Sequence, residues 1–197
     1  MKISALNSIN RLYFGYEDIA RALKINPPSA RVSASRYVKL GFLMRLKRNI
    51  YVLRERWQTA NREDQFALAN LGQSPSYISL MTALDYHEIT NQVQRGIIES
   101  VAVKRTKEIS LNGCEFRYTK VSRTRYFGFI RQQEFFIATP EKALLDAVYL
   151  MSFGRYALDL AAIDGEKLNR KEIRRMSQNY PPKTRKMLEK HEYLGPA

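Results

Sequence analysis

The sequence predicts an α+β protein: an N-terminal winged helix-turn-helix domain, then an α+β domain with a mixed or antiparallel sheet and flanking helices. Three observations predict this fold class. Three short amphipathic segments with helix-capping residues precede a basic two-strand segment near the N-terminus. Short runs rich in β-branched and aromatic residues then follow one another over residues 97–139. Helical patterns fill the rest of the chain. We therefore expect domains at residues 1–57 and 64–197.

The first segments are predicted as three helices. Apolar residues of the first recur at helical spacing, at Ile3, Leu6, Ile9 and Tyr13. The second, "YEDIARALKI" (residues 16–25), begins with acidic residues, which the helix dipole favours. The third lies in "NPPSARVSASRYVKLG", with Asn26 as the expected N-cap, two prolines in the opening turn and Gly41 as the expected C-cap.

A hairpin and a second domain are predicted next. "FLMRLKRNIYVLR" (residues 42–54) indicates two strands around a turn, where Asn49 tolerates a left-handed backbone. After a polar boundary at residues 54–64, we expect helices over residues 62–72 and 76–89. Strands are expected over residues 99–106, 108–113, 114–121, 125–130 and 134–139. A helix capped by Thr139 should follow, and then a helical tail broken at its Pro-Pro pair.

The charge is large and uneven. The 197 residues carry a formal net charge of +14, and residues 1–60 hold 12 basic and 3 acidic side chains against 21 and 16 in the remainder. Such an excess favours a polyanionic partner, with nucleic acid first and an anionic membrane surface second. The chain has one cysteine, no apolar run of the ~18–20 residues that a membrane span needs, and no apolar core in its first ten residues. We expect a cytoplasmic, nucleoid-associated protein that does not insert into a membrane.

The third helix is predicted to read DNA. On a helical wheel, Ala30, Ala34, Tyr37 and Val38 form a packing face. The opposite arc and its shoulders contain small or basic side chains, with no acidic residue in the helix: Val32, Ser35, Arg36 and Lys39, flanked by Ser29, Arg31 and Ser33. Small side chains allow close approach to a groove, Arg can bind guanine or phosphate, Ser can hydrogen-bond either, and Val can contact a thymine methyl.

The hairpin adds basic residues suited to backbone or minor-groove contact, at Arg45, Lys47 and Arg48. Two other interpretations stay open: a solvated basic face on a protein-binding winged helix, and an RNA-binding module. A second basic set follows in the expected strands and tail. Because alternate strand residues face opposite sides, this set does not form one surface by default.

No catalytic residue, metal site or cofactor is predicted. Two histidines and one cysteine are too few for a nitrogen and sulfur zinc site, and there is no glycine-rich phosphate loop. His87 is expected to cap a helix or to pack between the domains. Glu141 and Asp146, five residues apart, are expected to serve the helix start and a hydrogen bond to a neighbouring element. We therefore expect a protein that is not an enzyme.

Three segments resemble AbiEi-type antitoxins of type IV toxin–antitoxin (abortive infection) systems. "YVKLGFLMRLKRNIYVL" resembles the end of their recognition helix and wing, through Tyr37, Val38, Gly41, Arg45, Arg48 and Tyr51. "SLMTALDYHEI" resembles their Ser-x-x-x-Ala-Leu-x-x-His-Gly-Leu helix, and "TPEKALLDAVYL" their Pro-Glu-Lys-x-Leu-Leu-Asp helix. Asn49 and Glu88 stand where the pattern has Gly, and Ile89 replaces its last Leu. The matches span residues 30–150, and no motif extends into the tail.

The resemblance implies an antitoxin that represses its own operon by binding inverted repeats in the promoter. It also implies a functional partner, a co-encoded nucleotidyltransferase-like toxin, which such proteins oppose without a stable complex. The alternative is a protein-interaction or toxin-modifying antitoxin, whose C-terminal domain acts directly on the toxin while DNA binding is secondary.

Overall fold

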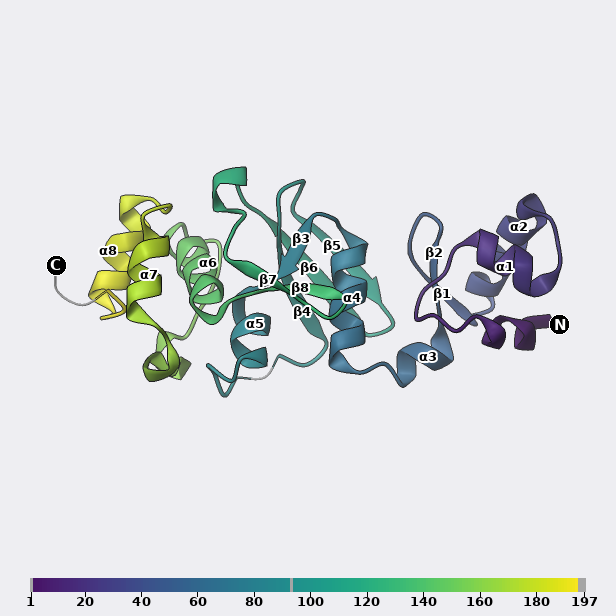
Figure 1. Ribbon diagram of the computed structural model, residues 1–197, viewed down its shortest axis with the longest axis horizontal. Helices are drawn as coiled ribbons and strands as arrows, with labels where there is room; N and C mark the ends of the chain where they lie inside the picture. Colours follow the sequence, from purple (N-terminus) through teal and green to yellow (C-terminus); the bar gives the residue numbers. More distant parts are fainter. Residues whose placement is uncertain (1, 93, 195–197) are drawn as a thin grey trace.

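The computed structural model describes residues 2–92 and 94–194 and has three parts along its length (Figure 1). The N-terminal helices and a hairpin lie at one end, a sheet with its helices lies in the middle, and the last helices lie at the other end. Residue 1 of the predicted first domain and residues 93 and 195–197 of the predicted second domain lie outside the described residues. None of the described helices combines the length and the apolar composition that crossing a membrane requires.

The N-terminal part has the order of elements of a winged helix. It consists of η1 (Lys2–Ser8), α1 (Tyr16–Leu23), α2 (Pro27–Lys39), β1 (Leu43–Lys47) and β2 (Ile50–Leu53). The first predicted helix is shorter than expected and has 3-10 geometry. Its expected last apolar position, Tyr13, instead lies in a bent segment after the helix. The next residue, Phe14, pairs with Tyr51 of β2 through backbone hydrogen bonds of 3.0 and 2.9 Å.

Both ends of α2 are fixed by the residues that predicted them. The Asn26 side chain accepts a hydrogen bond from the Ser29 backbone N–H at 2.8 Å. At the other end, Gly41 has a φ of 78°, and its N–H donates to the carbonyl of Val38. The N–H of the next residue, Phe42, donates to the carbonyl of Tyr37. These are the two bonds of a Schellman motif, and the helix ends there because glycine adopts the left-handed conformation without steric cost.

The middle of the molecule is a six-stranded mixed sheet, which confirms the predicted α+β class. Its strands are β3 (Ser76–Ile78), β4 (Ile97–Ala102), β5 (Lys107–Leu111), β6 (Cys114–Lys120), β7 (Phe129–Gln132) and β8 (Phe135–Ala138). Their order is β5-β6-β4-β3-β8-β7. The β3–β8 and β4–β6 pairs are parallel and the other three are antiparallel. The short helix α3 (Arg54–Gln58) leads into α4 (Arg62–Gly72), which packs against β3, β4 and β8.

One predicted helix was wrong at its start. The expected helix over residues 76–89 is divided into the central strand β3 and the helix α5 (Leu80–Tyr86). Tyr77 and Ile78 are fully buried and pair with Val101 of β4 and Ile137 of β8, respectively. Their apolar character therefore serves a sheet with a neighbour on each side, which a helical wheel does not distinguish from a helix core.

The C-terminal helices follow the prediction from residue 170 onward, whereas residues 155–169, also expected to be helical, form irregular segments and short 3-10 turns. α6 (Pro140–Ser152) begins at Thr139, whose side chain accepts a hydrogen bond from the Lys142 backbone N–H at 3.3 Å. α7 (Arg170–Ser177) and α8 (Pro182–Lys190) pack against α6, and the expected break falls at Pro181. Two short 3-10 turns connect α6 to α7, η3 (Leu160–Ala162) and η4 (Gly165–Lys167).

The β1–β2 hairpin is shared by two hydrophobic cores. Leu43, Tyr51 and Leu53 pack with the N-terminal helices. The residues that alternate with them face the sheet and α4, and they belong to the large core: Met44, Leu46 and Val52. Because successive strand residues point to opposite faces, the hairpin separates the first half of the chain (residues 2–53) from the second half (residues 54–194).

Candidate nucleic-acid interface

The outward face of α2 has the composition that the sequence predicted. Ala30 and Ala34 are fully buried and Tyr37 is nearly so, whereas Val32 is 70% exposed. The predicted base-reading side chains around Val32 face solvent, apart from the half-buried Ser33: Ser29, Arg31, Ser35, Arg36 and Lys39. An apolar side chain that is so exposed among serines and basic residues gives α2 a face with the chemistry needed to contact base edges.

Four basic side chains of α2 and the hairpin are available for binding. They are Arg36, Lys39, Arg45 and Arg48, and all four are exposed. Within residues 2–92 and 94–194, they form no hydrogen bond or ion pair with the protein. Unlike a paired surface Arg, such a group can bind phosphate without first losing a partner.

Arg31 differs from these four, because its guanidinium is held by α1. Nη2 donates to the Tyr16 hydroxyl at 2.8 Å, and the guanidinium carbon lies 4.3 Å from the centre of the Tyr16 ring. The structure therefore places Arg31 at the α1–α2 junction, where a contact with DNA would require it to leave Tyr16 or to use its remaining N–H groups.

The tip of the hairpin is anchored to α1 by Asn49. This residue has a φ of 59°, as the turn prediction required. Its Oδ1 accepts a hydrogen bond from the Tyr16 backbone N–H at 2.7 Å, and its Nδ2 donates to Glu17 at 3.1 Å. The hydrogen bond from Asn49 lowers the pKa of Glu17. Because Asn49 is fixed in this way, the neighbouring Arg48 is presented from an anchored turn.

Lys47 points away from the tip toward the second half of the chain. Its Nζ donates to the carbonyl of Leu71, at the end of α4, at 2.6 Å. Burial lowers the pKa of Lys47, and the charge of Lys104 lowers it further. Burial also lowers the pKa of Lys107, with smaller effects from Arg105 and Lys47. The hairpin thus meets a basic cluster (Lys47, Lys104, Arg105 and Lys107) that the sequence analysis did not identify.

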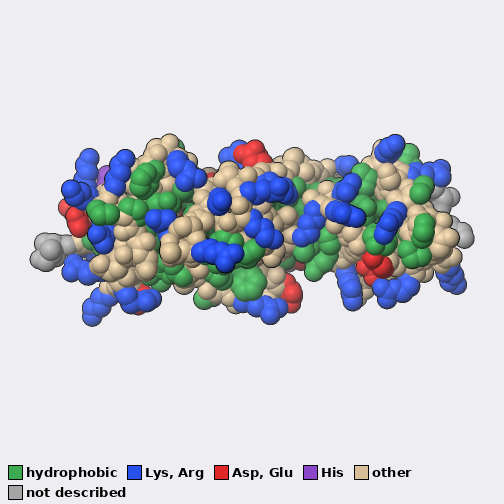
Figure 2. Space-filling model, turned by 90° about the horizontal axis from the view of Figure 1, so that it is seen from above, with side chains coloured by type: hydrophobic (Ala, Val, Ile, Leu, Met, Phe, Trp, Pro, Cys, Tyr) green, Lys and Arg blue, Asp and Glu red, His purple; other side chains and the backbone are tan. Residues whose placement is uncertain are grey.

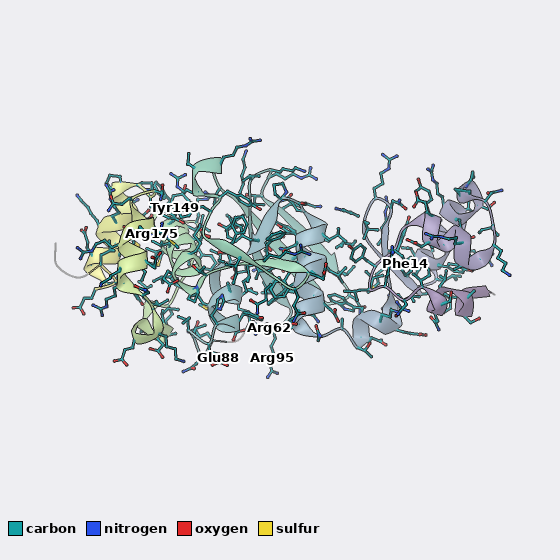
Figure 3. The ribbon with its side chains drawn as sticks, viewed as in Figure 1. Phe14, Arg62, Glu88, Arg95, Tyr149 and Arg175 are labelled. Atoms are coloured by element: carbon teal, nitrogen blue, oxygen red, sulfur yellow. The ribbon has the colours of Figure 1, made fainter. Side chains whose placement is uncertain are left out.

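No local signal could have revealed this cluster, because Lys47 and Lys104 are far apart in the chain and meet only through packing of β1 on β5. Figure 2 shows Lys and Arg side chains along the length of one face, from the N-terminal helices to the C-terminal helices. Phe14, labelled in Figure 3, lies beside the hairpin, where its pairing with Tyr51 joins the N-terminal segment to the wing.

The Asp146 carboxylate of α6 lies in a buried hydrogen-bond network. Asp146 is fully buried and accepts hydrogen bonds from Tyr77, Ser79 and Tyr180 at 2.8–2.9 Å. The ammonium group of Lys142, also fully buried, donates to the same carboxylate. Asp146 thus bonds to neighbouring elements, as predicted. His87 is the C-cap residue of α5, which confirms one of its two expected roles. Its Nε2 lies 2.8 Å from the carbonyl oxygen of Ala138, so it packs inside the second half instead of between domains.

Comparisons with known proteins show the fold. No protein-family model and no curated protein matches the sequence. Among solved structures, the crystal structure of the Rv2827c protein from Mycobacterium tuberculosis is similar, with a TM-score of 0.62. The similarity covers 98% of this chain and 75% of that chain, at 10% sequence identity. A protein of known structure therefore has a similar fold, with winged-helix-like N-terminal elements and a mixed sheet with flanking helices. The similarity extends over nearly the whole of this chain.

Proposed function

We propose that this protein is a sequence-specific DNA-binding antitoxin of the AbiEi type, which represses its own operon by binding inverted repeats in the promoter. The observation that carries the proposal is the outward face of α2, where an exposed Val32 lies among serines and basic side chains in a helix without an acidic residue. A solvated helix face would more commonly mix both signs of charge.

The contacts can be assigned by chemistry. Val32, Ser35 and Arg36 are proposed to read base edges, with Ser29, Arg31, Ser33 and Lys39 beside them. Arg45 and Arg48 are proposed to bind the phosphate backbone from the hairpin. Lys47 contributes as part of the basic cluster, because its hydrogen bond to Leu71 keeps it away from the tip. Each phosphate neutralised should steepen the dependence of log K on log salt by roughly 0.9.

Two positions where the residue differs from the AbiEi pattern keep the backbone conformation of that pattern. Asn49 and Glu88 replace glycines of that pattern, and both residues have left-handed backbones here, with φ values of 59° and 58°. Glu88, labelled in Figure 3, follows α5 at the edge of the molecule. A glycine is the residue expected at such positions, so the chain keeps the backbone geometry of the pattern where it has lost the residue.

The proposal includes a functional partner, a co-encoded nucleotidyltransferase-like toxin that the protein counteracts without a stable complex and without enzymatic activity of its own. A gene for such a protein beside this one would support it. Co-purification of a second protein would instead favour the alternative, in which the second half acts directly on the toxin.

Fluorescence anisotropy with the protein's own upstream DNA and a scrambled duplex, at 50 and 200 mM salt, tests DNA reading. We expect a preference of ~10³ or more for the upstream DNA that survives the higher salt concentration. Equal affinities for the two duplexes that fall together as salt rises would contradict sequence reading. The binding would then be unspecific electrostatic attraction by the net charge of +14.

A further inference from the structure

A groove of about 580 Å³ lies where the two halves of the chain meet. It is lined by the bent segment that leads into Phe14, by α4, by residues 74–76 at the start of β3, and by Tyr126 with the β7–β8 hairpin that follows it. Its volume falls in the range of ~300–1,000 Å³ that is usual for small-molecule sites. None of the residues of the proposed DNA-binding surface lines it.

Four aromatic side chains line the groove: Tyr13, Tyr126, Phe129 and Phe136. Tyr126 and Phe129 lie with ring centres 4.9 Å apart, and Phe129 meets Phe136 edge-on at 6.0 Å. Tyr13 lines the groove from the N-terminal segment. Tyr13 and Phe136 are 40% and 41% exposed, which is unusual for large aromatic side chains. Such rings offer flat surfaces to an apolar ring system.

One buried polar group in the lining lacks a partner among the described residues. The Asn70 side chain is 9% exposed, and its Oδ1 accepts a hydrogen bond from the Phe136 backbone N–H at 2.5 Å. This bond fixes the orientation of the carboxamide, so the other end must be Nδ2. Nδ2 is buried and has no hydrogen-bond partner among the described residues. A buried donor of this kind costs roughly 1–3 kcal/mol when it is left unpaired.

The charged groups of the lining do not favour a cation or an anion. The Asp64 carboxylate accepts a hydrogen bond from the Asn61 backbone N–H at 3.3 Å in the cap of α4, and Glu134 lies 3.7 Å from Arg131. Both carboxylates therefore already have partners, and the guanidinium of Arg11, which also lines the groove, offsets one of the two negative charges. A neutral ligand remains, with an acceptor for Asn70 and a ring for the aromatic walls.

We propose that this groove binds a flat, neutral, largely aromatic small molecule that carries a carbonyl-type acceptor. The ring system lies between Tyr13 and the Tyr126–Phe129–Phe136 wall, and the acceptor receives the hydrogen bond from Asn70 Nδ2. Such a ligand contacts both halves of the chain, since Tyr13 directly precedes the residue that pairs with the wing. The proposal does not depend on the identity of the DNA site.

The test is titration of the ¹⁵N-labelled full chain with 2-naphthamide and with naphthalene, which lacks the acceptor, monitored by ¹H–¹⁵N correlation spectra. We expect 2-naphthamide to cause saturable shifts in the Asn70 side-chain amide and the Phe136 backbone N–H. Naphthalene should bind at least about tenfold more weakly, since one hydrogen bond to a buried donor is worth about that factor.

Two variants and one control complete the test. Asn70→Asp keeps an oxygen for Phe136 N–H but removes the free donor, and should weaken 2-naphthamide by about tenfold or more. Ala67→Trp, on the half-buried face of α4 that lines the groove, should abolish binding by filling it. Phe153→Ala removes an exposed aromatic residue outside the groove and should change nothing. Thermal unfolding shows whether each variant is folded. If Asn70→Asp does not fold, Ala67→Trp alone tests the site.

Two results would overturn the proposal. Absence of a saturable shift up to millimolar 2-naphthamide would exclude the site. Equal binding of naphthalene, together with an unaffected Ala67→Trp variant, would mean unspecific adsorption to exposed aromatic surface.

Discussion

The Oδ1 of Asn49, at the tip of the hairpin, accepts a hydrogen bond from the backbone N–H of Tyr16, in the first turn of α1, at 2.7 Å. One side chain therefore both forms the turn and satisfies a helix N–H that has no partner within its own helix. Through this bond, the position of the wing depends on the position of α1, on which α2 also packs.

Substitutions of Asn49 should separate its two roles. Asn49→Gly keeps the left-handed turn but loses the hydrogen bonds, and should lower the free energy of unfolding by about 1 kcal/mol. Asn49→Ala also forces a Cβ into the left-handed region and should cost about 2 kcal/mol in total. Urea unfolding measures both. Equal losses for the two variants would show that the turn conformation contributes nothing.

Glu88→Gly should stabilise the protein. Glu88 has a φ of 58°, and removing its Cβ relieves a strain of roughly 1 kcal/mol, partly offset by the greater freedom of glycine in the unfolded chain. Glu88→Ala keeps the Cβ and is the matched control, for which we expect no gain. A midpoint of thermal unfolding that rises for Gly and not for Ala checks this prediction.

Arg36→Ala should weaken binding to the cognate promoter site by ~1–3 kcal/mol if Arg36 contacts guanine through two hydrogen bonds. Lys190→Ala makes the same change of charge at the end of α8, far from α2, and should have little effect (Figure 1). Anisotropy on cognate and scrambled duplexes distinguishes the roles. An equal loss on both duplexes would reduce Arg36 to a phosphate contact.

Lys142→Met should lower the free energy of unfolding by about 3 kcal/mol or more, because it leaves the buried Asp146 carboxylate without its cation. Burial lowers the pKa of Lys142, while the charge of Asp146 opposes that shift. Lys171→Met, at an exposed position on α7, is the control. If urea unfolding gives the same small change for both variants, the hydroxyl groups of Tyr77, Ser79 and Tyr180 are sufficient to stabilise Asp146.

Glu99→Gln should stabilise the protein increasingly as the pH rises. Burial raises the pKa of Glu99 above its ordinary value of 4.5, although Tyr156 donates a hydrogen bond to it at 2.8 Å. Because the folded chain holds this proton more tightly, the stability that Glu99 contributes is complete below pH 4.5 and is lost as the pH rises through its folded pKa.

Gln remains uncharged throughout, so the difference in unfolding free energy between Glu99→Gln and the unmodified chain should grow from pH 4 to pH 8, by roughly 1.4 kcal/mol for each unit by which folding raises the pKa. The exposed Glu166 provides the control Glu166→Gln. A difference that stays constant with pH would contradict the prediction.

Local signals account for the parts of this structure that the sequence predicted. Asn26 and Gly41 fix the ends of α2 through contacts within a few residues, and Asn49 forms its turn for the same reason. The strand at Ser76–Ile78 was missed because its residues owe their burial to strands that come later in the chain. The effect of the Lys104 charge on the pKa of Lys47 likewise depends on packing between elements. The same holds for the hydrogen bond from Arg31 to Tyr16.

The hairpin that separates the two hydrophobic cores sets a limit on dissecting this protein. A fragment ending near residue 57 would expose Met44, Leu46, Val52 and Trp57 to water, all of which are buried in the whole chain. Such a fragment should self-associate, and its loss of DNA affinity would report aggregation rather than a missing contact. Solubilising the fragment with Leu46→Lys and Trp57→Glu, or comparing point variants in the intact protein, avoids this ambiguity. The two halves are therefore poor candidates for exchange between proteins as independent modules.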